Sequence, residues 1–374
     1  MSKLPPSLPK PIQDLDDAQR AYNLLLELEK RLLIPSQEIQ VGFGRASTSQ
    51  PKTNADPRER RNLVLCRILG YLLHHAPTYE ARASVVDGIL ACNGDEERVL
   101  EFGEVFLYLI RAFHSNPAKT TTPSRDLFDR AASDLRVEDA SGSSLQPKDH
   151  WSVKKYALKR DGYRCMISGA FDGDAGEQFP EILAKKRGVP GSRWAATRCS
   201  HIFAEVMNND ADNTVDESNW SASIWMTLEK FGYASMLDEL KGSSIHRLEN
   251  VMTLDPTVHA HFESLKIWLV ASDDPNAESN TYKLEATRPL FIEDYPKIVR
   301  FQSSDLESLP LPSPRYLEIH AAVARIAHLS GATQYIDRVM RDLEDSTVLA
   351  DDGSSGELLE HLLKQARPLE IEIH

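Results

Sequence analysis

The sequence lacks the features that mark secreted and membrane proteins. Its first residues, MSKLPPSLPKPIQDLDD, contain no apolar segment of the length that a signal peptide needs. No uninterrupted apolar run approaches the roughly 20 residues of a membrane-spanning helix. We therefore expect an intracellular protein. The nucleus and the cytoplasm both stay open, because the basic run 185–187 is too short to identify a nuclear signal.

Cysteine is scarce as well. The chain has four cysteines, and none forms a CxxC pair; they are Cys66, Cys92, Cys165 and Cys199. Isolated cysteines of this kind are typical of free thiols in a reducing compartment, and they do not offer the paired ligands of a structural zinc site. We expect Cys165 and Cys199 to be buried as small apolar side chains.

The chain has no excess of positive charge. Its formal net charge is −13, which argues against a protein that coats nucleic acid indiscriminately. Residues 151–200 differ, because ten Lys and Arg stand there against five Asp and Glu, a local charge of +5. A local basic cluster matters more than the total charge, so we expect this stretch to contact nucleic acid. A surface loop of mixed charge is the alternative.

The pattern of apolar residues divides the 374 residues into four regions. Residues 1–115 show helical periodicity and predict an N-terminal helical bundle. The next region, 116–150, is rich in Thr, Ser, Pro and Gly and predicts a flexible linker. Short β-like runs and turn residues prevail over 151–290, and helical patterns return over 291–374. The sequence therefore predicts an α+β protein with a central module flanked by helices.

The expected helices can be stated by their residues. They cover 14–34, 58–76, 81–92 and 96–114 before the linker, and 313–331, 333–345 and 356–367 after the central module. In the first of them we expect an apolar stripe of Leu24, Leu25, Leu28, Leu32 and Leu33. These leucines fill a core and imply no chemistry.

The residues with chemical potential lie in three segments of the central module. The segments are LKRDGYRCMISGAFD (158–172), TRCSHIFAEV (197–206) and HRLENVMTLDPTVHAHFESLKIWLV (246–270). In the third, Asp255 followed by Pro256 predicts the start of a helix over 256–265, between strand-like residues 247–254 and 266–270. His259 and Glu263 lie four positions apart on that helix and could share one cation, whereas His261 points elsewhere. A solvated helix face is the alternative for the pair.

The ordered set His201, Asn250 and His259 resembles the HNH endonuclease motif, in the form common among HNH domains of fungal proteins. Those domains read approximately A-H-I and then N-G-L-L-L-x-x-x-x-H-x-x-F-D. Asn250 and His259 keep the nine-residue separation, Phe262 occupies the aromatic position, and Glu263 stands for the Asp. The resemblance implies a central ββα-metal module and a metal-dependent endonuclease that acts on DNA rather than RNA.

The resemblance also implies roles for individual residues. His201 would be the general base that takes a proton from water, and Asn250 would orient the loop or His201. His259 and Glu263 would bind a divalent ion, which could be Mg, Mn, Zn or Ni. Three further residues are candidates for binding the substrate in the cleft of the module; they are Arg198, His246 and Arg247. A histidine buried in a core and a turn-forming asparagine are the alternatives for His201 and Asn250.

One departure from the family pattern bears on activity. Many HNH nucleases have an Asp or His ligand just before the general base, whereas this chain has Ser200. A third protein ligand would then be an outside carboxylate, for which Glu205 and Asp172 are both candidates. The alternative hypothesis is an HNH scaffold that no longer cuts and binds a protein partner, or another copy of itself, through its helical flanks. Chemistry on a small molecule in the same pocket is a third hypothesis.

Overall fold

The computed structural model describes residues 2–13, 15–34, 57–114, 147, 149–208, 224–303 and 305–345. The chain forms two compact units, the first made of Met1–Leu109, Thr214–Gly232 and Ile326–His374 and the second of Ile110–Asn213 and Tyr233–Arg325. Most of the expected linker and the whole of the expected helix 356–367 lie outside the described residues. Among the residues described, no helix is long and apolar enough to cross a membrane.

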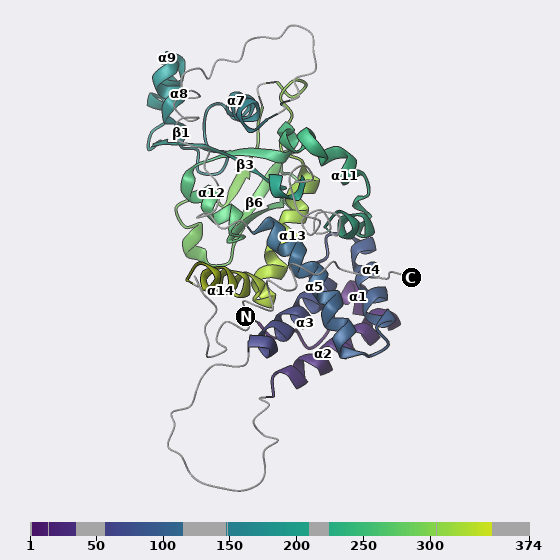
Figure 1. The fold of residues 1–374 in the computed structure, drawn as a ribbon. Coiled ribbons are helices and arrows are strands. Elements are labelled where there is room, and N and C mark those ends of the chain that lie inside the picture. The colour runs from purple at the N-terminus through teal and green to yellow at the C-terminus, as the bar shows by residue number, and fades with distance from the viewer. Residues whose placement is uncertain are drawn as a thin grey trace, which may run out of the picture. The chain divides into compact units, whose positions relative to one another are not determined.

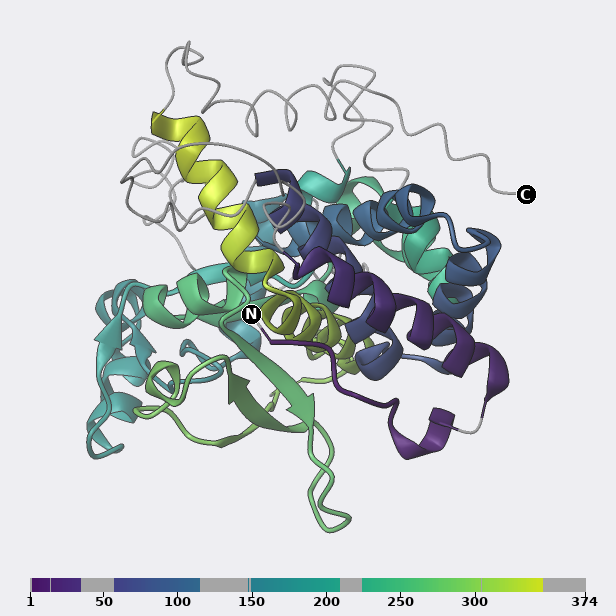
Figure 2. The same cartoon turned by 90° about the horizontal axis from the view of Figure 1, so that it is seen from below.

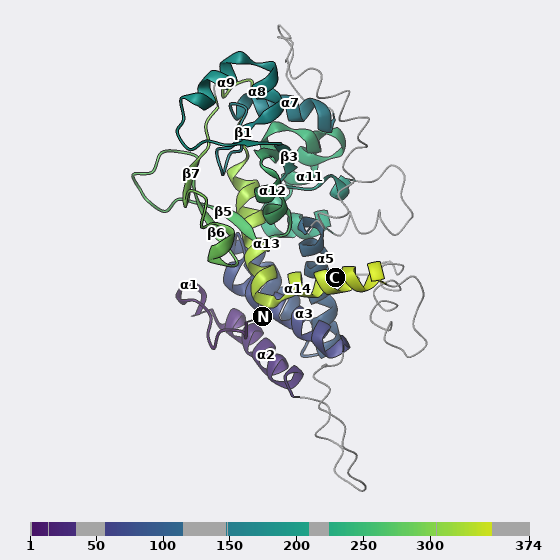
Figure 3. The ribbon, with the colours of Figure 1, turned by 90° about the vertical axis from the view of Figure 1, so that its left-hand side faces the viewer.

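The first unit is helical. Its helices are α1 (Lys10–Gln13), α2 (Asp16–Leu32), α3 (Pro57–His75), α4 (Tyr79–Ala91), most of α5 (Glu96–Phe113) and α14 (Ala332–Asp345). Helix α2 packs against α3 and α4, and Figure 3 shows α2 and α3 side by side. Leu25 and Leu28 are buried as expected, but Leu33 is exposed because α2 ends at Leu32. A buried ion pair joins Glu29 of α2 to Arg67 of α3, with Oε1 and Nε 2.6 Å apart.

The second unit combines helices with three small sheets, so the predicted α+β class is confirmed (Figure 1). Its helices are α7 (His150–Arg160), α8 (Gly173–Gln178), α9 (Pro180–Arg187), α11 (Ser235–Leu240), α12 (Pro256–Glu263) and most of α13 (Pro314–Ser330). Short helical turns occur at η2 (Glu205–Asn208), η4 (Gly242–His246), η5 (Leu248–Asn250) and η6 (Pro289–Phe291).

The strands of this unit pair as follows. Strand β1 (Phe171–Asp172) runs parallel to β2 (Trp194–Ala195), and β3 (Arg198–His201) runs antiparallel to β4 (Val251–Leu254). The third sheet has the order β5 (Ile267–Ala271), β6 (Thr281–Ala286), β7 (Ile298–Arg300), and Figure 2 shows the turn between β5 and β6 extending away from it. Most residues of the predicted site lie on or next to these elements: Arg198 and His201 in β3, His246 and Asn250 in the turns η4 and η5 that precede β4, and His259 and Glu263 in α12.

Strand β4 is shorter than the sequence pattern suggests. The strand-like segment 247–254 begins as a 3-10 turn over Leu248–Asn250 and becomes a strand only at Val251. The amide N–H of Asn250 donates to the carbonyl oxygen of Arg247, so this backbone turns before the ladder with β3 starts. Helix α12 begins as predicted, because Asp255 caps it by accepting from the N–H groups of Thr257 and Val258.

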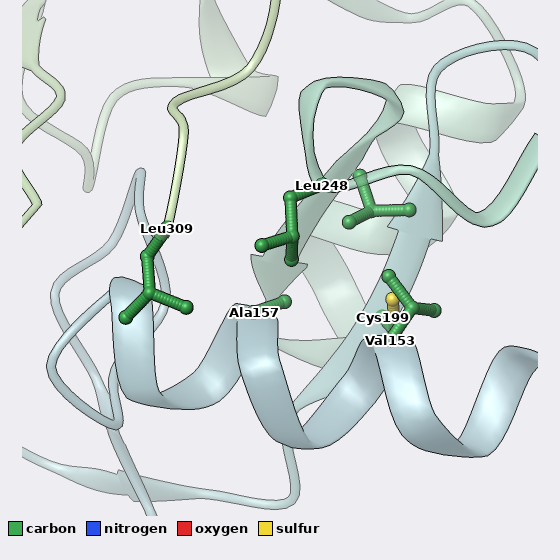
Figure 4. Close-up of a cluster of buried hydrophobic side chains, with 6 residues drawn as sticks. Val153, Ala157, Cys199, Leu248 and Leu309 are labelled. Carbon is green, nitrogen blue, oxygen red and sulfur yellow. The ribbon is translucent and has the colours of Figure 1, made fainter. Parts of the chain in front are cut away.

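Helix α7 was not expected from the sequence, where short β-like runs were predicted after residue 150. The helix begins with a capping box. The side chain of Asp149 accepts from the N–H of Ser152, and the Ser152 hydroxyl oxygen accepts from the N–H of Asp149. Val153 and Ala157 lie four positions apart on its buried face and pack against Cys199 of β3 and Leu248 (Figure 4). Two apolar residues on this face of a basic helix are only a weak periodic signal in the sequence. The helix is therefore stabilised by tertiary packing.

A buried ion pair fastens α7 to the strands. The guanidinium of Arg160 donates from Nε and Nη2 to the two carboxylate oxygens of Asp161, at 2.6 and 3.0 Å. The same guanidinium donates to the carbonyl oxygens of Leu248 and Val251, at 2.6 and 2.8 Å. Asp161 in turn accepts from the N–H of Thr253. Arg160 therefore stabilises the packing of α7 on the strands, and its charge is not available to a nucleic acid.

Candidate active site

His201 ends strand β3 and meets two other histidines and a carboxylate. Its Nε2 lies 3.2 Å from Nδ1 of His246, and its Nδ1 lies 3.6 Å from Oε1 of Glu205. The ring of His150, the first residue of α7, stacks on that of His201 at 5.6 Å between centroids. We call these four residues, His150, His201, Glu205 and His246, the histidine cluster. Sequence analysis assigned His201 and His246 to the site and kept Glu205 as a candidate, but it missed His150.

Burial and charge set the protonation of the histidine cluster. Burial lowers the pKa of His201 to about 3, although the carboxylate of Glu205 acts in the opposite direction. The hydrogen bond with His150, together with the neighbouring imidazoles, lowers the pKa of Glu205 to about 2. Burial also lowers the pKa of His246. At neutral pH the site therefore holds a neutral His201 next to an ionised Glu205.

Asn250 lies just before β4 and is fully buried. Its Oδ1 accepts from the N–H of Phe203, and its Nδ2 donates to the carbonyl oxygens of Phe203 and Ile245 at 3.0 and 2.9 Å. These three bonds join the segment that follows His201 to the segment that precedes His246. The side chain therefore positions both histidines through the backbone, and it does not contact either ring.

His259 and Glu263 form a second group, on α12. His259 Nε2 lies 3.2 Å from Glu263 Oε1, and the two side chains are 9% and 15% exposed, so the pair is not a solvated helix face. Glu263 Oε2 is buried and has no hydrogen-bond partner among the described residues. His261, two positions from His259, packs instead against Phe291, as its direction on the helix predicted.

The α12 pair is poorly solvated. Burial raises the pKa of Glu263 to about 7, and the positive charge of Arg198 opposes this shift. Burial and then the charge of Arg198 lower the pKa of His259 to about 4. An uncharged imidazole beside a carboxyl group with an unsatisfied oxygen is a donor set that suits a divalent cation.

Ser200 and the two candidate carboxylates differ in how they are engaged. The hydroxyl of Ser200 is buried and has no hydrogen-bond partner in the part of the chain that the structure describes. Asp172 caps α8 by accepting from the N–H of Ala175 and also accepts from the N–H and hydroxyl of Thr197. Its lone pairs are used for structure, whereas Glu205 faces His201 with a side chain that is 48% exposed. Of the two carboxylates, Glu205 is the one in the site.

The candidate substrate-binding residues lie in different environments. Arg198 is exposed and starts β3 close to the α12 pair. Arg247 is half-buried, and its guanidinium donates to both carboxylate oxygens of Glu249, at 3.2 and 2.9 Å. Among the other basic residues of 151–200, Arg193 donates to Asp255 and Lys186 lies over the exposed ring of Trp194. Arg198 is thus the predicted substrate-binding arginine with fewest competing contacts.

The buried cysteines and tryptophans behave as packing residues. All four cysteines are buried free thiols. The N–H of Ser168 donates to Cys165 Sγ, and the Ser168 hydroxyl donates to Asp255. Trp225 and Trp268 are also buried.

Together, the fold and the site define a small α+β domain in which a pair of strands and a helix carry histidines, an asparagine and carboxylates in a fixed order. Residues 165–270 match the model of a protein family described as HNH endonuclease, which confirms the resemblance seen in the sequence. A domain of this family indicates nuclease-type hydrolysis and the binding of nucleic acid. Neither the curated proteins nor the solved structures contain a match to the chain. His150 lies outside the matched residues.

Proposed function

We propose that the chain is a metal-dependent endonuclease that hydrolyses phosphodiester bonds in DNA, with His201 as the general base. One observation supports this above the others. Within the residues that match the HNH endonuclease model, the buried Asn250 hydrogen-bonds across the segments that carry His201 and His246, and α12 follows with His259. We propose that β3, β4 and α12 are the ββα-metal module of this enzyme.

His201 is placed to act as the base for this reaction. Its imidazole is neutral at pH 7, so a ring nitrogen can accept a proton from the attacking water. Burial lowers its pKa and so weakens it as a base, and the carboxylate of Glu205 opposes that effect. The ring then becomes positively charged, and the carboxylate of Glu205, 3.6 Å from Nδ1, offsets that charge. Asn250 keeps the ring in place through the backbone of Phe203.

The α12 pair fits a metal ion because Glu263 Oε1 faces His259 Nε2, and Oε2 of the same carboxyl group is buried with no hydrogen-bond partner among the residues that the structure describes. We propose that His259 and Glu263 hold a divalent cation, which supplies several kcal/mol of stabilisation to the negative charge that develops on the phosphate. Arg198, exposed and close to this pair, binds a substrate phosphate as a fixed positive charge.

Cleavage of supercoiled plasmid DNA tests the proposal. We expect purified protein to nick the plasmid in the presence of Mg²⁺ or Mn²⁺, and we expect His201→Ala to lose at least about 100-fold in rate, the usual contribution of a general base. His261→Ala is the matched control, because this histidine lies on α12 but packs against Phe291. Equal cutting by His201→Ala and wild type would contradict the assignment, and an RNA substrate of the same length tests the preference for DNA.

Ser200 favours a second candidate function. Its buried hydroxyl stands where many HNH nucleases have a charged or imidazole ligand, which leaves His259 and Glu263 as the two motif residues for a metal. A scaffold that binds nucleic acid or protein without cutting would fit this site. A folded protein that binds DNA in a mobility-shift assay, but cuts with none of Mg²⁺, Mn²⁺, Zn²⁺ or Ni²⁺, would establish this alternative.

A further inference from the structure

The histidine cluster brings together residues from four separate segments. His150 begins α7, His201 ends β3, Glu205 lies in η2 and His246 ends η4. The segments of the three histidines are each held in place: α7 by the packing of Val153 and Ala157, β3 by its ladder with β4, and the end of η4 by the Asn250 bond to Ile245 next to His246. Donor atoms that packing holds in place need little rearrangement to bind an ion.

The donor atoms converge on one carboxylate oxygen. Glu205 Oε1 lies 3.1 Å from Nδ1 of His150, 3.6 Å from Nδ1 of His201 and 3.8 Å from Nδ1 of His246. The ligand atoms of His150, His201 and Glu205 all lie within 4.8 Å of one another. A tetrahedral ion with metal–nitrogen distances of about 2.0–2.1 Å separates neighbouring ligand atoms by about 3.4 Å. The distances of 3.1 and 3.6 Å from Glu205 to His150 and His201 are close to this separation.

A plain ion pair does not explain this arrangement. Contact between His150 and Glu205 accounts for the 3.1 Å distance, and the hydrogen bond with His201 Nε2 accounts for Nδ1 of His246. Neither contact explains why Nδ1 of His201 also lies 3.6 Å from the same oxygen. The cluster also has an entrance, since His150 and Glu205 are 41% and 48% exposed, whereas His201 is 8% exposed. Such a site has a buried floor and an accessible rim.

We propose that His150, His201 and Glu205, with His246 beside them, bind a divalent transition metal ion such as Zn²⁺, at a site separate from the α12 pair. Imidazole-rich donor sets select Zn²⁺, Co²⁺, Ni²⁺ or Cu²⁺ over Mg²⁺ and Ca²⁺. The ion occupies a lone pair of His201, so this histidine cannot accept a proton while the ion is bound. If the proposed function holds, on which this consequence alone rests, Zn²⁺ inhibits the cleavage that Mg²⁺ supports.

Cobalt spectroscopy on the full chain tests the site without any need for activity. The protein is freed of metal with EDTA, desalted and titrated with Co²⁺, whose visible absorption reports tetrahedral coordination, and Zn²⁺ is then added to displace it. We expect the absorption of tetrahedral Co²⁺ to saturate at one ion per chain. His150→Ala and Glu205→Gln should weaken Co²⁺ binding by more than about 100-fold, and His246→Ala by about 10- to 100-fold, the range for a residue next to the ligands.

The controls separate this site from the family motif. His259→Ala and Glu263→Gln should leave the Co²⁺ absorption unchanged, and thermal melts in EDTA show that each variant is folded. Loss of absorption in His259→Ala but not in His150→Ala, or no absorption with wild type, would overturn the proposal. In the cleavage assay, Zn²⁺ should inhibit the Mg²⁺-supported cleavage by wild type over the same concentration range in which it displaces Co²⁺. Co²⁺ binding that depends on His150 in a protein that never cuts would refute the proposed function alone.

Discussion

Asn250 binds both backbone polar groups of Phe203: its Oδ1 accepts from the amide N–H at 2.9 Å, and its Nδ2 donates to the carbonyl oxygen at 3.0 Å. This bidentate contact holds the chain as it leaves β3, two residues beyond His201. A third bond, to Ile245, holds the chain next to His246. The asparagine of the motif therefore determines where two histidines of the site lie, although it touches neither.

Replacing Asn250 by alanine should destabilise the second unit strongly. The change leaves one buried N–H and two buried carbonyl oxygens without their partner, and each unsatisfied group costs about 1–3 kcal/mol. We expect the free energy of unfolding to fall by about 3 kcal/mol or more, measured by urea denaturation followed by circular dichroism. Asn276→Ala, at an exposed turn, should change it by less than about 0.5 kcal/mol. Similar values for the two variants would contradict the role of Asn250.

Replacing Arg160 by methionine should lower the free energy of unfolding by a similar amount, for an electrostatic reason. Methionine fills much of the volume but leaves the carboxylate of Asp161 buried without its charged partner, which typically costs about 3–5 kcal/mol. The same denaturation experiment measures the loss, and Arg164→Met, at an exposed position of the same segment, is the control. A loss below about 1 kcal/mol would show that the Arg160–Asp161 pair is not needed to hold α7 on the strands.

Stability should depend on pH through His320. This histidine of α13 stacks on Phe262 at 3.8 Å between ring centroids, and burial lowers its pKa to about 3. The unfolded chain, with a histidine pKa near 6.5, binds the proton first, so stability falls as the pH drops below about 6.5, by up to about 1.4 kcal/mol per pH unit. His320→Phe keeps the stacking and should reduce this slope between pH 6 and pH 4. An unchanged slope in denaturation curves at several pH values would refute the prediction.

Metal binding by the α12 pair should appear as thermal stabilisation. An ion that binds only the folded state at 100 times its Kd adds about 2.7 kcal/mol. We expect Mn²⁺ to raise the Tm of wild type and of His261→Ala, but not of His259→Ala, measured by differential scanning fluorimetry. The same titration of His150→Ala should still raise the Tm, which distinguishes this site from the histidine cluster. A shift that survives in His259→Ala would place the ion elsewhere.

Local sequence patterns predict much of the fold. Helices with long apolar stripes, such as the one around Leu25 and Leu28, were predictable because helical periodicity is a local property. Helix α12 was predictable from Asp255 and Pro256, which determine a helix start by themselves. Helix α7 was not, since Val153 and Ala157 acquire their apolar neighbours only when Cys199 and Leu248 pack against them.

By itself, the sequence determined the order and spacing of the motif: a histidine at 201, an asparagine at 250, and a histidine and a carboxylate four apart on one helix. Spacing within a helix has a fixed geometry, so His259 and Glu263 had to share a face. Tertiary structure alone decided that Glu205, and not Asp172, faces His201, and that His150 joins them. His150 and Glu205 are 55 positions apart in the chain. Their contact depends on how α7 packs on β3, and a distance set by packing between segments leaves no periodic trace in the sequence.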